Sequence, residues 1–199
     1  MNNKLIIAID AMGGENAPSK NIEGLKIFLD KNKKDNDCFF YLYGDKNLID
    51  KEIIRNNIKY KNIKIFHTNS VVSDEETPLT AVKNSKNSSM WNSINSQIIS
   101  DACISLSAGN TGVLFVISRM ILKTMENVSK PALAGLWPSK KGMSVVLDLG
   151  ANVDCDEKNL VDFSELGAAL YKSIFPNEKI KVSLLNIGSE DIKGTESIK

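Results

Sequence analysis

Small and polar residues gather in four short segments, each of which directly follows an apolar run. The segments are residues 10–18 (DAMGGENAP), 107–112 (SAGNTG), 148–154 (DLGANVD) and 186–194 (NIGSEDIKG). Glycines let the backbone approach a ligand closely, and hydroxyl, amide and backbone N–H groups donate hydrogen bonds to oxygen anions. Such segments are suited to holding a phosphate group or the oxyanion of a tetrahedral intermediate.

Gly13 and Gly14 stand between an apolar run and an amphipathic stretch that predicts a helix capped near Ser19. Two interpretations are open: the pair forms a phosphate cradle at the helix N-terminus, or it forms a tight strand-to-helix turn without a ligand. The pair is not part of a GxGxxG pattern, which disfavours a nicotinamide-dependent dehydrogenase.

The segment at 107–112 contains more capping residues than one helix needs. Asn110 or Thr111 could cap the apolar helix expected to follow, and Ser107 and Gly112 stand beside them. Capping alone is one interpretation. The other is an anion site, since a helix N-terminus carries about half a positive charge that stabilises a phosphate or oxyanion. The redundancy of polar residues favours the second.

Asp148, Asn152 and Asp154 place carboxylates and an amide after another expected strand. They indicate either the mouth of a cleft or a local Asx-turn. A metal site at Asp148 and Asp154 is disfavoured because no histidine is nearby, and we predict no metal and no cofactor. The single histidine, His67, has no evident Ser or Cys partner and is expected to be structural or at the surface.

Short strand-like runs alternate with helical patterns along the chain. We expect strands at 5–9, 38–43, 63–66, 103–106, 132–136, 144–147 and 182–185, and helices at 20–30, 48–56, 90–99, 111–125 and 157–174. This alternation predicts an α/β fold with a mainly parallel sheet covered by helices on both faces. The simplest organisation is one domain over residues 1–199. In such sheets ligands bind beyond the carboxyl ends of the strands, where the polar segments begin.

Composition limits the class of protein. The 199 residues are 42% hydrophobic and carry a formal net charge of +1, which disfavours nucleic acid as a partner. Three cysteines (Cys38, Cys103 and Cys155) lie far apart, as expected in a reducing cytoplasm. The N-terminal run lacks a secretory cleavage site, and no apolar stretch reaches the roughly 18–20 residues that span a bilayer. We therefore expect any membrane to be touched from outside.

Taken together, these segments resemble the PlsX family, the acyl-acyl-carrier-protein:phosphate acyltransferases. The motifs are DAMGGENAP, NSSM at 87–90, SAGNTG, DLGANVDCD at 148–156 and LLNIGSEDIKG at 184–194. The resemblance runs from Ile7 to the last residue, in the family's order and spacing. It departs at Glu15, where Asp is common, and at Val113, where Ala is usual.

The resemblance implies a three-layer α/β/α sandwich, similar to the isocitrate and isopropylmalate dehydrogenases. It implies transfer of a fatty acyl group from acyl carrier protein to inorganic phosphate, giving acyl-phosphate for phospholipid synthesis. It also implies a homodimer, peripheral contact with the inner face of the cytoplasmic membrane, and a downstream glycerol-3-phosphate acyltransferase. Family members extend well beyond Lys199, so the acyltransferase domain is expected to be incomplete at its C-terminus.

Alternatives to this function also stand. A phosphate acyltransferase of the same fold could use acyl-coenzyme A as its donor, or a truncated chain could be a non-catalytic binding module. For carrier protein, which is acidic, the docking surface is expected at four basic residues, Lys51, Arg55, Lys59 and Lys61.

Phosphate itself supplies the nucleophile in this chemistry, because its second pKa is roughly 6 to 7 by analogy with phosphoserine. Orientation and oxyanion stabilisation are then the main tasks of the site. The residues expected to contact phosphate, the oxyanion or the substrate are Gly13, Gly14, Ser107, Asn110, Thr111, Gly112, Asn152 and Asn186.

The catalytic group is expected to comprise Asn110, three carboxylates and a lysine. Because carboxylates repel phosphate, Asp10, Asp148 and Asp154 are expected to orient the loops or a lysine rather than to bind the anion. Lys193 is the candidate cation, with its charge neutralising phosphate.

Overall fold

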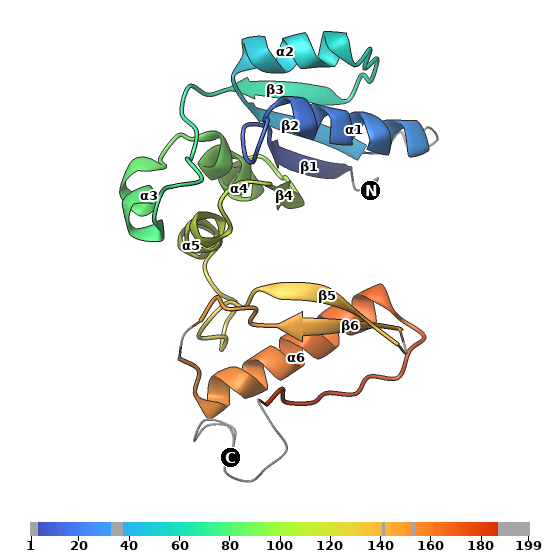
Figure 1. The fold of residues 1–199 in the computed structure, drawn as a ribbon, viewed down its shortest axis with the longest axis vertical. Helices are drawn as coiled ribbons and strands as arrows, with labels where there is room; N and C mark the ends of the chain where they lie inside the picture. The colour runs from blue at the N-terminus through green and yellow to red at the C-terminus, as the bar shows by residue number, and fades with distance from the viewer. Residues whose placement is uncertain (1–3, 33–37, 141, 153, 187–199) are drawn as a thin grey trace. The chain divides into compact units, whose positions relative to one another are not determined.

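The chain divides into two compact units, Met1–Lys123 and Thr124–Lys199. The structure, a computed structural model, describes residues 4–32, 38–140, 142–152 and 154–186, and Figure 1 traces its helices and strands. Within these residues no helix combines the length and the apolar character that crossing a membrane requires.

A four-stranded parallel sheet with the order β3-β2-β1-β4 forms the centre of the first unit. The strands are β1 (Leu5–Asp10), β2 (Cys38–Gly44), β3 (Ile63–His67) and β4 (Ile104–Leu106). In this register Ile9 is opposite Leu106, and Asp10 is opposite Tyr43. Because β1 and β4 are parallel neighbours, the segments that follow them leave the same edge of the sheet side by side.

Helices α1 (Ser19–Lys31) and α2 (Lys46–Arg55) cover one face of this sheet (Figure 1). Their buried side chains Ile22, Leu25 and Ile49 join Phe40 and Leu42 of β2 in one apolar core. The α2 helix begins where the Asp45 side chain accepts hydrogen bonds from two backbone N–H groups, a standard N-cap.

The other face of the sheet carries α4 (Ser89–Ile99), which contacts β1, β2 and β4. Ser93 and Ser96 are buried on this helix, and their hydroxyls donate to backbone carbonyls of Met90 and Ser93 at 2.8 and 2.6 Å. Short side chains with satisfied hydroxyls let the helix lie close to the strands. Helices α3 (Pro78–Asn84) and α5 (Thr111–Leu122) pack against each other, and α5 packs on α4 through a second apolar cluster.

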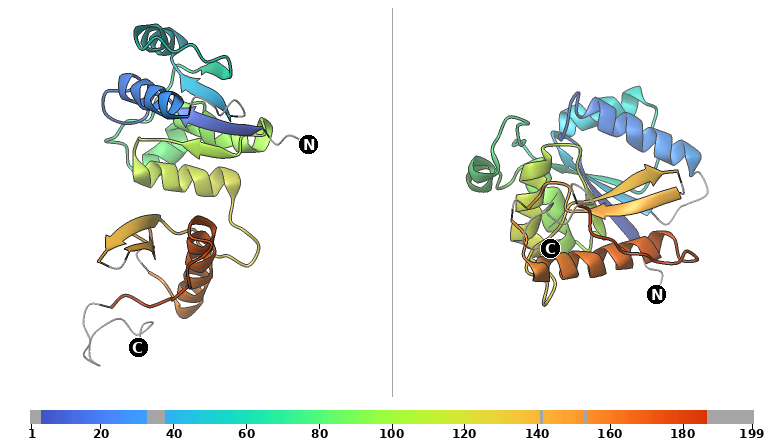
Figure 2. Two further views of the ribbon diagram at one scale, coloured as in Figure 1. Left: turned by 90° about the vertical axis from the view of Figure 1, so that its right-hand side faces the viewer. Right: turned by 60° about the horizontal axis from the view of Figure 1, so that its bottom comes forward.

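In the second unit, the described residues form an antiparallel hairpin and one long helix. Strand β5 (Ala134–Ser139) pairs with β6 (Gly142–Leu147), and α6 (Glu157–Ile174) packs against β6, as Figure 2 shows. The helix begins with a capping box in which Asp156 and Asn159 exchange hydrogen bonds.

The structure confirms the predicted α/β class with a mainly parallel sheet flanked by helices. The predicted strand at 182–185 is wrong: this segment forms no strand among the described residues, and Leu185 is 85% exposed. An apolar run predicts the tendency to extend, but a strand also needs a neighbour with which to pair.

Other differences concern one helix that was not predicted and the ends of two others. The α3 helix was not predicted, although Thr77 followed by Pro78 is a helix-start signal and Thr77 does cap it. Helix α5 stops at Leu122 instead of 125, because Lys123 has a φ of 62° and leaves the helical conformation. Helix α1 begins at Ser19, as expected, but its N-cap is Pro18 and no side chain caps it.

Candidate functional site

The segments after β1 and β4 meet at a hydrogen bond between Asp10 and Ser107. The Ser107 hydroxyl donates to Oδ2 of Asp10 at 2.7 Å and accepts from the Gly109 N–H at 3.1 Å. The Met12 N–H donates to Oδ1 of Asp10 at 3.3 Å. Asp10 is only 1% exposed. Its carboxyl group therefore connects the two segments inside the protein and does not face solvent.

Burial raises the pKa of the Asp10 carboxyl above its ordinary value. Nearby donors act in the opposite direction, namely the hydroxyls of Ser89 and Ser107 and the N–H groups of Met12 and Gly13. Removing water disfavours the charged form, whereas donors that point at a carboxylate favour it. The desolvation effect is the larger, so this group retains its proton to a higher pH than an exposed aspartate.

Gly13 and Gly14 lie against the segment after β4. A Cβ atom on Gly13 would lie 2.4 Å from Oδ2 of Asp10 and 2.8 Å from Oγ of Ser107. Gly14 has a φ of +89°, and a Cβ there would lie 2.6 Å from the Ala108 carbonyl oxygen. The close approach of the two segments therefore requires glycine at both positions. This requirement is separate from the turn and from any ligand.

Asn21 on α1 holds the segment after β1 in place. Its Nδ2 group donates to the carbonyl oxygens of Ala11 and Gly13, both at 2.9 Å. Backbone carbonyls beyond the end of a strand need hydrogen-bond partners of this kind. Sequence reasoning missed Asn21, because an asparagine in a helix carries no signal that distinguishes this contact from solvent exposure.

Asn110 is the N-cap of α5, with its Oδ1 atom accepting from the Val113 N–H at 3.1 Å. Its Nδ2 group donates to the carbonyl oxygens of Asp74 and Glu76, each at 3.0 Å. The whole amide is thus engaged in fixing the start of α5 and the segment before α3. Thr111 and Gly112, the first residues of α5, are exposed.

Replacing Asn110 with alanine is expected to lower the free energy of unfolding by about 1 to 2 kcal/mol, since it removes an N-cap and two further hydrogen bonds. Asn110→Ser keeps a capping oxygen but not the amide donors, so its loss should be smaller. Urea denaturation of the three proteins measures the difference. Equal stability of the alanine variant and the wild type would contradict this account of the cap.

In the second unit, Asp148 organises its own loop. Its backbone has a φ of 60°. Its Oδ1 atom accepts from the backbone and side-chain nitrogens of Asn152 at 3.1 and 2.9 Å, and Asn152 also donates to the Pro131 carbonyl at 2.9 Å. Asp148 and Asn152 therefore tie residues 148–152 to the segment before β5.

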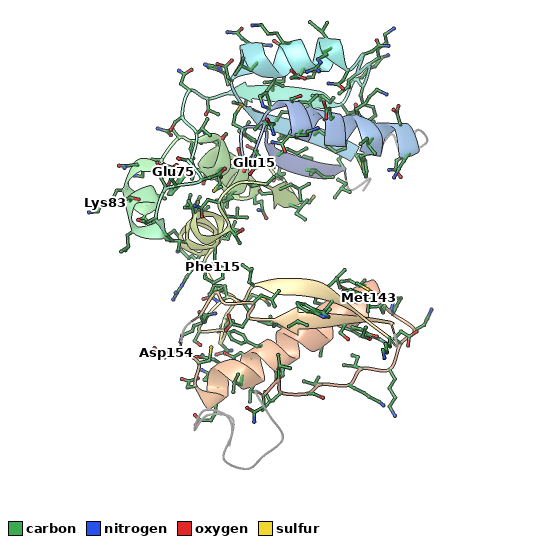
Figure 3. The ribbon with its side chains drawn as sticks, in the orientation of Figure 1. Glu15, Glu75, Lys83, Phe115, Met143 and Asp154 are labelled. Atoms are coloured by element: carbon green, nitrogen blue, oxygen red, sulfur yellow. The ribbon has the colours of Figure 1, made fainter. Side chains whose placement is uncertain are left out.

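The rest of this loop contains Asp154 and Cys155, between β6 and α6. The backbone carbonyl of Asp154, labelled in Figure 3, accepts from Nζ of Lys130 at 2.6 Å. The Cys155 thiol donates to Oδ2 of Asp148 at 3.5 Å. Burial, followed by the neighbouring Asp148 carboxylate, raises the pKa of this thiol, so Cys155 is protonated near neutral pH and is a poor nucleophile.

The predicted residues thus fall into separate groups. The first unit brings together Asp10, Gly13, Gly14 and Ser107, with Asn110, Thr111 and Gly112 at the start of α5, and the second unit holds Asp148, Asn152 and Asp154. Asn186 is the last described residue and follows the exposed segment, while Lys193 lies outside the described residues.

In the described ranges no cluster of three or more His, Cys, Asp or Glu side chains could hold a metal ion. His67 is exposed and accepts from the Lys46 N–H at 3.2 Å.

Comparison with known proteins extends over nearly the whole chain. A family described as "Fatty acid synthesis protein" matches residues 5–199. The chain is 49% identical over 193 residues to a phosphate acyltransferase from Pelagibacter ubique, covering 97% of this chain and 56% of that protein. It is 37% identical over 199 residues to a phosphate acyltransferase from Rhodospirillum rubrum, covering 100% and 56%. The chain thus spans little more than half the length of these relatives.

A solved structure shares the fold. The EutD phosphotransacetylase from Staphylococcus aureus matches with a TM-score of 0.55 and 13% identity, covering 88% of this chain and 55% of that one. At this identity the likeness concerns the fold alone. The family match and the sequence relatives carry the assignment, and the chain therefore belongs to the fatty acid synthesis protein family, the PlsX family that its motifs resemble.

Proposed function

We propose that the protein containing this chain transfers a fatty acyl group from acylated acyl carrier protein to inorganic phosphate, producing acyl-phosphate for phospholipid synthesis. One observation supports this most. The motif segments after β1 and β4 meet at the carboxyl edge of the sheet, where the Ser107 hydroxyl bonds to the Asp10 carboxyl and the Gly109 N–H, and where glycines allow the close approach. Relatives that align over nearly all of the chain are named phosphate acyltransferases.

The proposed reaction begins with attack of a phosphate oxygen on the thioester carbonyl carbon. A C–O bond forms and the carbonyl oxygen becomes an oxyanion. When the tetrahedral intermediate collapses, the C–S bond breaks and the thiolate of the carrier's prosthetic group departs, taking a proton from solvent. Since the phosphate dianion is the nucleophile, the protein's tasks are to orient the reactants and stabilise the oxyanion.

The start of α5 supplies the backbone donors in this proposal. The first-turn N–H of Val113 donates to Oδ1 of Asn110 and that of Leu114 to the Asn110 carbonyl. The N–H groups of Thr111 and Gly112 precede them at the positive end of the helix dipole, where an oxyanion is stabilised. Because the Asn110 amide is engaged, we propose that Asn110 contributes by holding these two donors in place.

The carboxylates are proposed to position the loops. Asp10 is buried beneath the junction and accepts from Ser107, so its charge need not contact phosphate. Asp148 likewise acts on its own loop through Asn152. The contacts of Gly13, Gly14, Ser107, Asn152 and Asn186 with phosphate or substrate, and a catalytic role for Asp154, remain predictions.

Lys193 is proposed to neutralise phosphate. In the full-length protein, Lys193→Ala is expected to raise the KM for phosphate about tenfold, the effect of losing one charge-assisted contact. Lys193→Arg retains the charge and should retain most of the affinity. Initial rates at varied phosphate measure both, and an unchanged phosphate KM in the alanine variant excludes this role.

Partners and location belong to the same proposal. Lys51, Arg55, Lys59 and Lys61 are exposed and are proposed to meet the acidic carrier protein. Arg55 also lies 3.5 Å from Glu52, which reduces the net charge of this surface. We further propose a homodimer that contacts the inner face of the cytoplasmic membrane and passes its product to a glycerol-3-phosphate acyltransferase.

The test uses the full-length protein with palmitoyl-acyl carrier protein and radiolabelled phosphate. Formation of acyl-phosphate that depends on both substrates is the expected result. A parallel reaction with palmitoyl-coenzyme A decides between the two donors, since faster turnover of the coenzyme A thioester would favour the acyl-CoA enzyme. Binding of phosphate or carrier protein without any product would instead favour a binding module.

A further inference from the structure

Ser89 lies beside the site, and its hydroxyl is fully buried. The sequence analysis predicted no role for this residue. It is the first residue of α4, directly after the N-cap Ser88, and its exposed fraction is 0%. Its backbone N–H donates to the Ser70 carbonyl at 3.0 Å. Its Oγ atom, by contrast, makes no hydrogen bond of standard geometry with any described residue. A buried hydroxyl without a partner is uncommon in folded proteins and calls for an explanation.

The nearby Asp10 carboxyl group has room for another donor. A carboxylate offers about four lone-pair positions. Hydrogen bonds of standard geometry reach it from Met12 N and Ser107 Oγ, at 3.3 and 2.7 Å. The Ser89 hydroxyl favours the ionised form of this carboxyl, and its helix α4 contacts β1, the strand that ends at Asp10. A buried charge is stabilised by each donor that points at it, so donor and acceptor complement each other.

We propose that Ser89 is a positioning residue of the site: its hydroxyl is a further donor to Asp10, and a small adjustment of the side chain completes that hydrogen bond. Through Asp10 it acts on Ser107, since the carboxylate that Ser89 holds is the acceptor for the Ser107 hydroxyl. This inference rests on the proposed acyl transfer for its effect on activity, whereas the link between Ser89 and Asp10 does not depend on it.

Two neighbouring serines, Ser88 and Ser85, provide a comparison with Ser89. Ser88 is buried as well, but its hydroxyl caps α4 by accepting from the Trp91 N–H at 3.1 Å. Ser85, 2% exposed, also has a buried hydroxyl without a partner among the described residues. Ser85 is not among the groups that act on Asp10. Ser85 therefore matches Ser89 in burial and chemistry and differs in its relation to the carboxyl group.

If Ser89 serves only as a small residue that lets α4 approach the sheet, alanine should replace it without consequence for Asp10. If it donates to the carboxylate, its removal should make ionisation of Asp10 harder. Among the described residues, the groups that act on the Asp10 ionisation are the hydroxyls of Ser89 on α4 and Ser107 after β4 and N–H groups of its own segment, and none of them is charged. A change in the pKa of Asp10 is therefore the specific signature of this contact.

The experiment compares Ser89→Ala, Ser89→Thr and Ser85→Ala with the wild type in the full-length protein. Infrared titration follows the Asp10 carboxyl band, assigned by its absence in Asp10→Asn. We expect Ser89→Ala to raise the pKa of Asp10, to lower kcat/KM about tenfold and to move the acid limb of its pH profile upward. Ser85→Ala should retain the wild-type values, and Ser89→Thr, which keeps a hydroxyl, should recover most of them.

The outcomes separate the two proposals. Identical Asp10 titrations in Ser89→Ala and Ser85→Ala would overturn the inference about Ser89, whatever the activity. A wild-type protein that forms no acyl-phosphate would reject the proposed function, while the titration would still decide the contact. A shifted titration with an unchanged pH profile would show that the contact exists and that Ser89 does not position the site.

Discussion

Gly13→Ala is expected to lower the kcat/KM of the full-length protein by roughly 10²-fold, the cost of misplacing reacting groups by about an ångström. The new Cβ would stand 2.4 Å from Oδ2 of Asp10 and 2.8 Å from Oγ of Ser107. Neither atom can retreat freely, because the two are hydrogen-bonded to each other and the carboxyl is buried. The segments after β1 and β4 must therefore separate.

Gly24→Ala provides the matched control. Gly24 lies within α1, and a Cβ there would meet no atom within 4 Å. Alanine in a helix interior is more stable than glycine by roughly 0.5 to 1 kcal/mol, so this variant should be fully active and slightly more stable. Steady-state kinetics and urea denaturation of both variants make the comparison. Full activity of Gly13→Ala would show that the junction between the segments is not needed for catalysis.

Asp10→Ala is the second substitution with a large expected effect, again roughly 10²-fold in kcat/KM. It removes the acceptor of the Ser107 hydroxyl and the Met12 N–H and leaves the buried Ser89 hydroxyl facing a cavity. Asp10→Asn fills the same volume and keeps one acceptor oxygen, so it should retain more activity. Kinetics at saturating carrier protein measure both. An alanine variant as active as the asparagine variant would contradict a positioning role.

The same carboxyl group makes stability depend on pH. Because the pKa of Asp10 is raised in the folded chain, the folded state holds this proton more tightly than the unfolded state does. Its contribution to stability is fully present below the ordinary value of 3.8 and is lost as the pH rises through the folded-state pKa. Asp10→Asn should remove this component. Urea denaturation of both proteins at increasing pH measures the difference, and parallel curves would contradict the assignment.

Kinetic pH profiles must account for the substrate as well. Phosphate loses its second proton at roughly pH 6 to 7, by analogy with phosphoserine, so every variant should share an acid limb of that origin. The Asp10 contribution is therefore the part of the wild-type profile that Asp10→Asn lacks. This comparison also gives the reference against which the Ser89 variants are judged.

The sequence was sufficient to predict the parallel strands and the loops at their ends. Alternation of buried β-branched runs with amphipathic stretches predicted β1 to β4, and the ends of β1 and β4 bear the polar segments that meet in the structure. Local patterns could not show which strands are neighbours. The adjacency of β1 and β4, which brings Ser107 to Asp10, is a property of the tertiary fold.

Other features depend on contacts that no local pattern encodes. Asn21 looks like an ordinary helix residue and Ser89 belongs to the NSSM motif without an evident role, and only the packing of α1 and α4 on the sheet reveals their relation to the segment after β1. Asn110 was expected to contact phosphate or the oxyanion as part of the catalytic group, and no local pattern showed that its amide would be engaged with Val113, Asp74 and Glu76. The sequence pointed to these polar residues, but local patterns could not divide those that support the loops from those that are predicted to contact a ligand.

The partners of the central hydrogen bond are separated by 97 positions in the sequence. During synthesis Asp10 emerges long before Ser107, and the β1–β4 edge cannot close until the ribosome has released β4. Closing so long a loop is entropically costly and places this edge among the late steps of folding. A nascent chain that has completed β1, β2 and β3 would therefore contain a paired sheet that lacks the bond between Asp10 and Ser107. The onset of activity is thus linked to the last steps of folding of this unit.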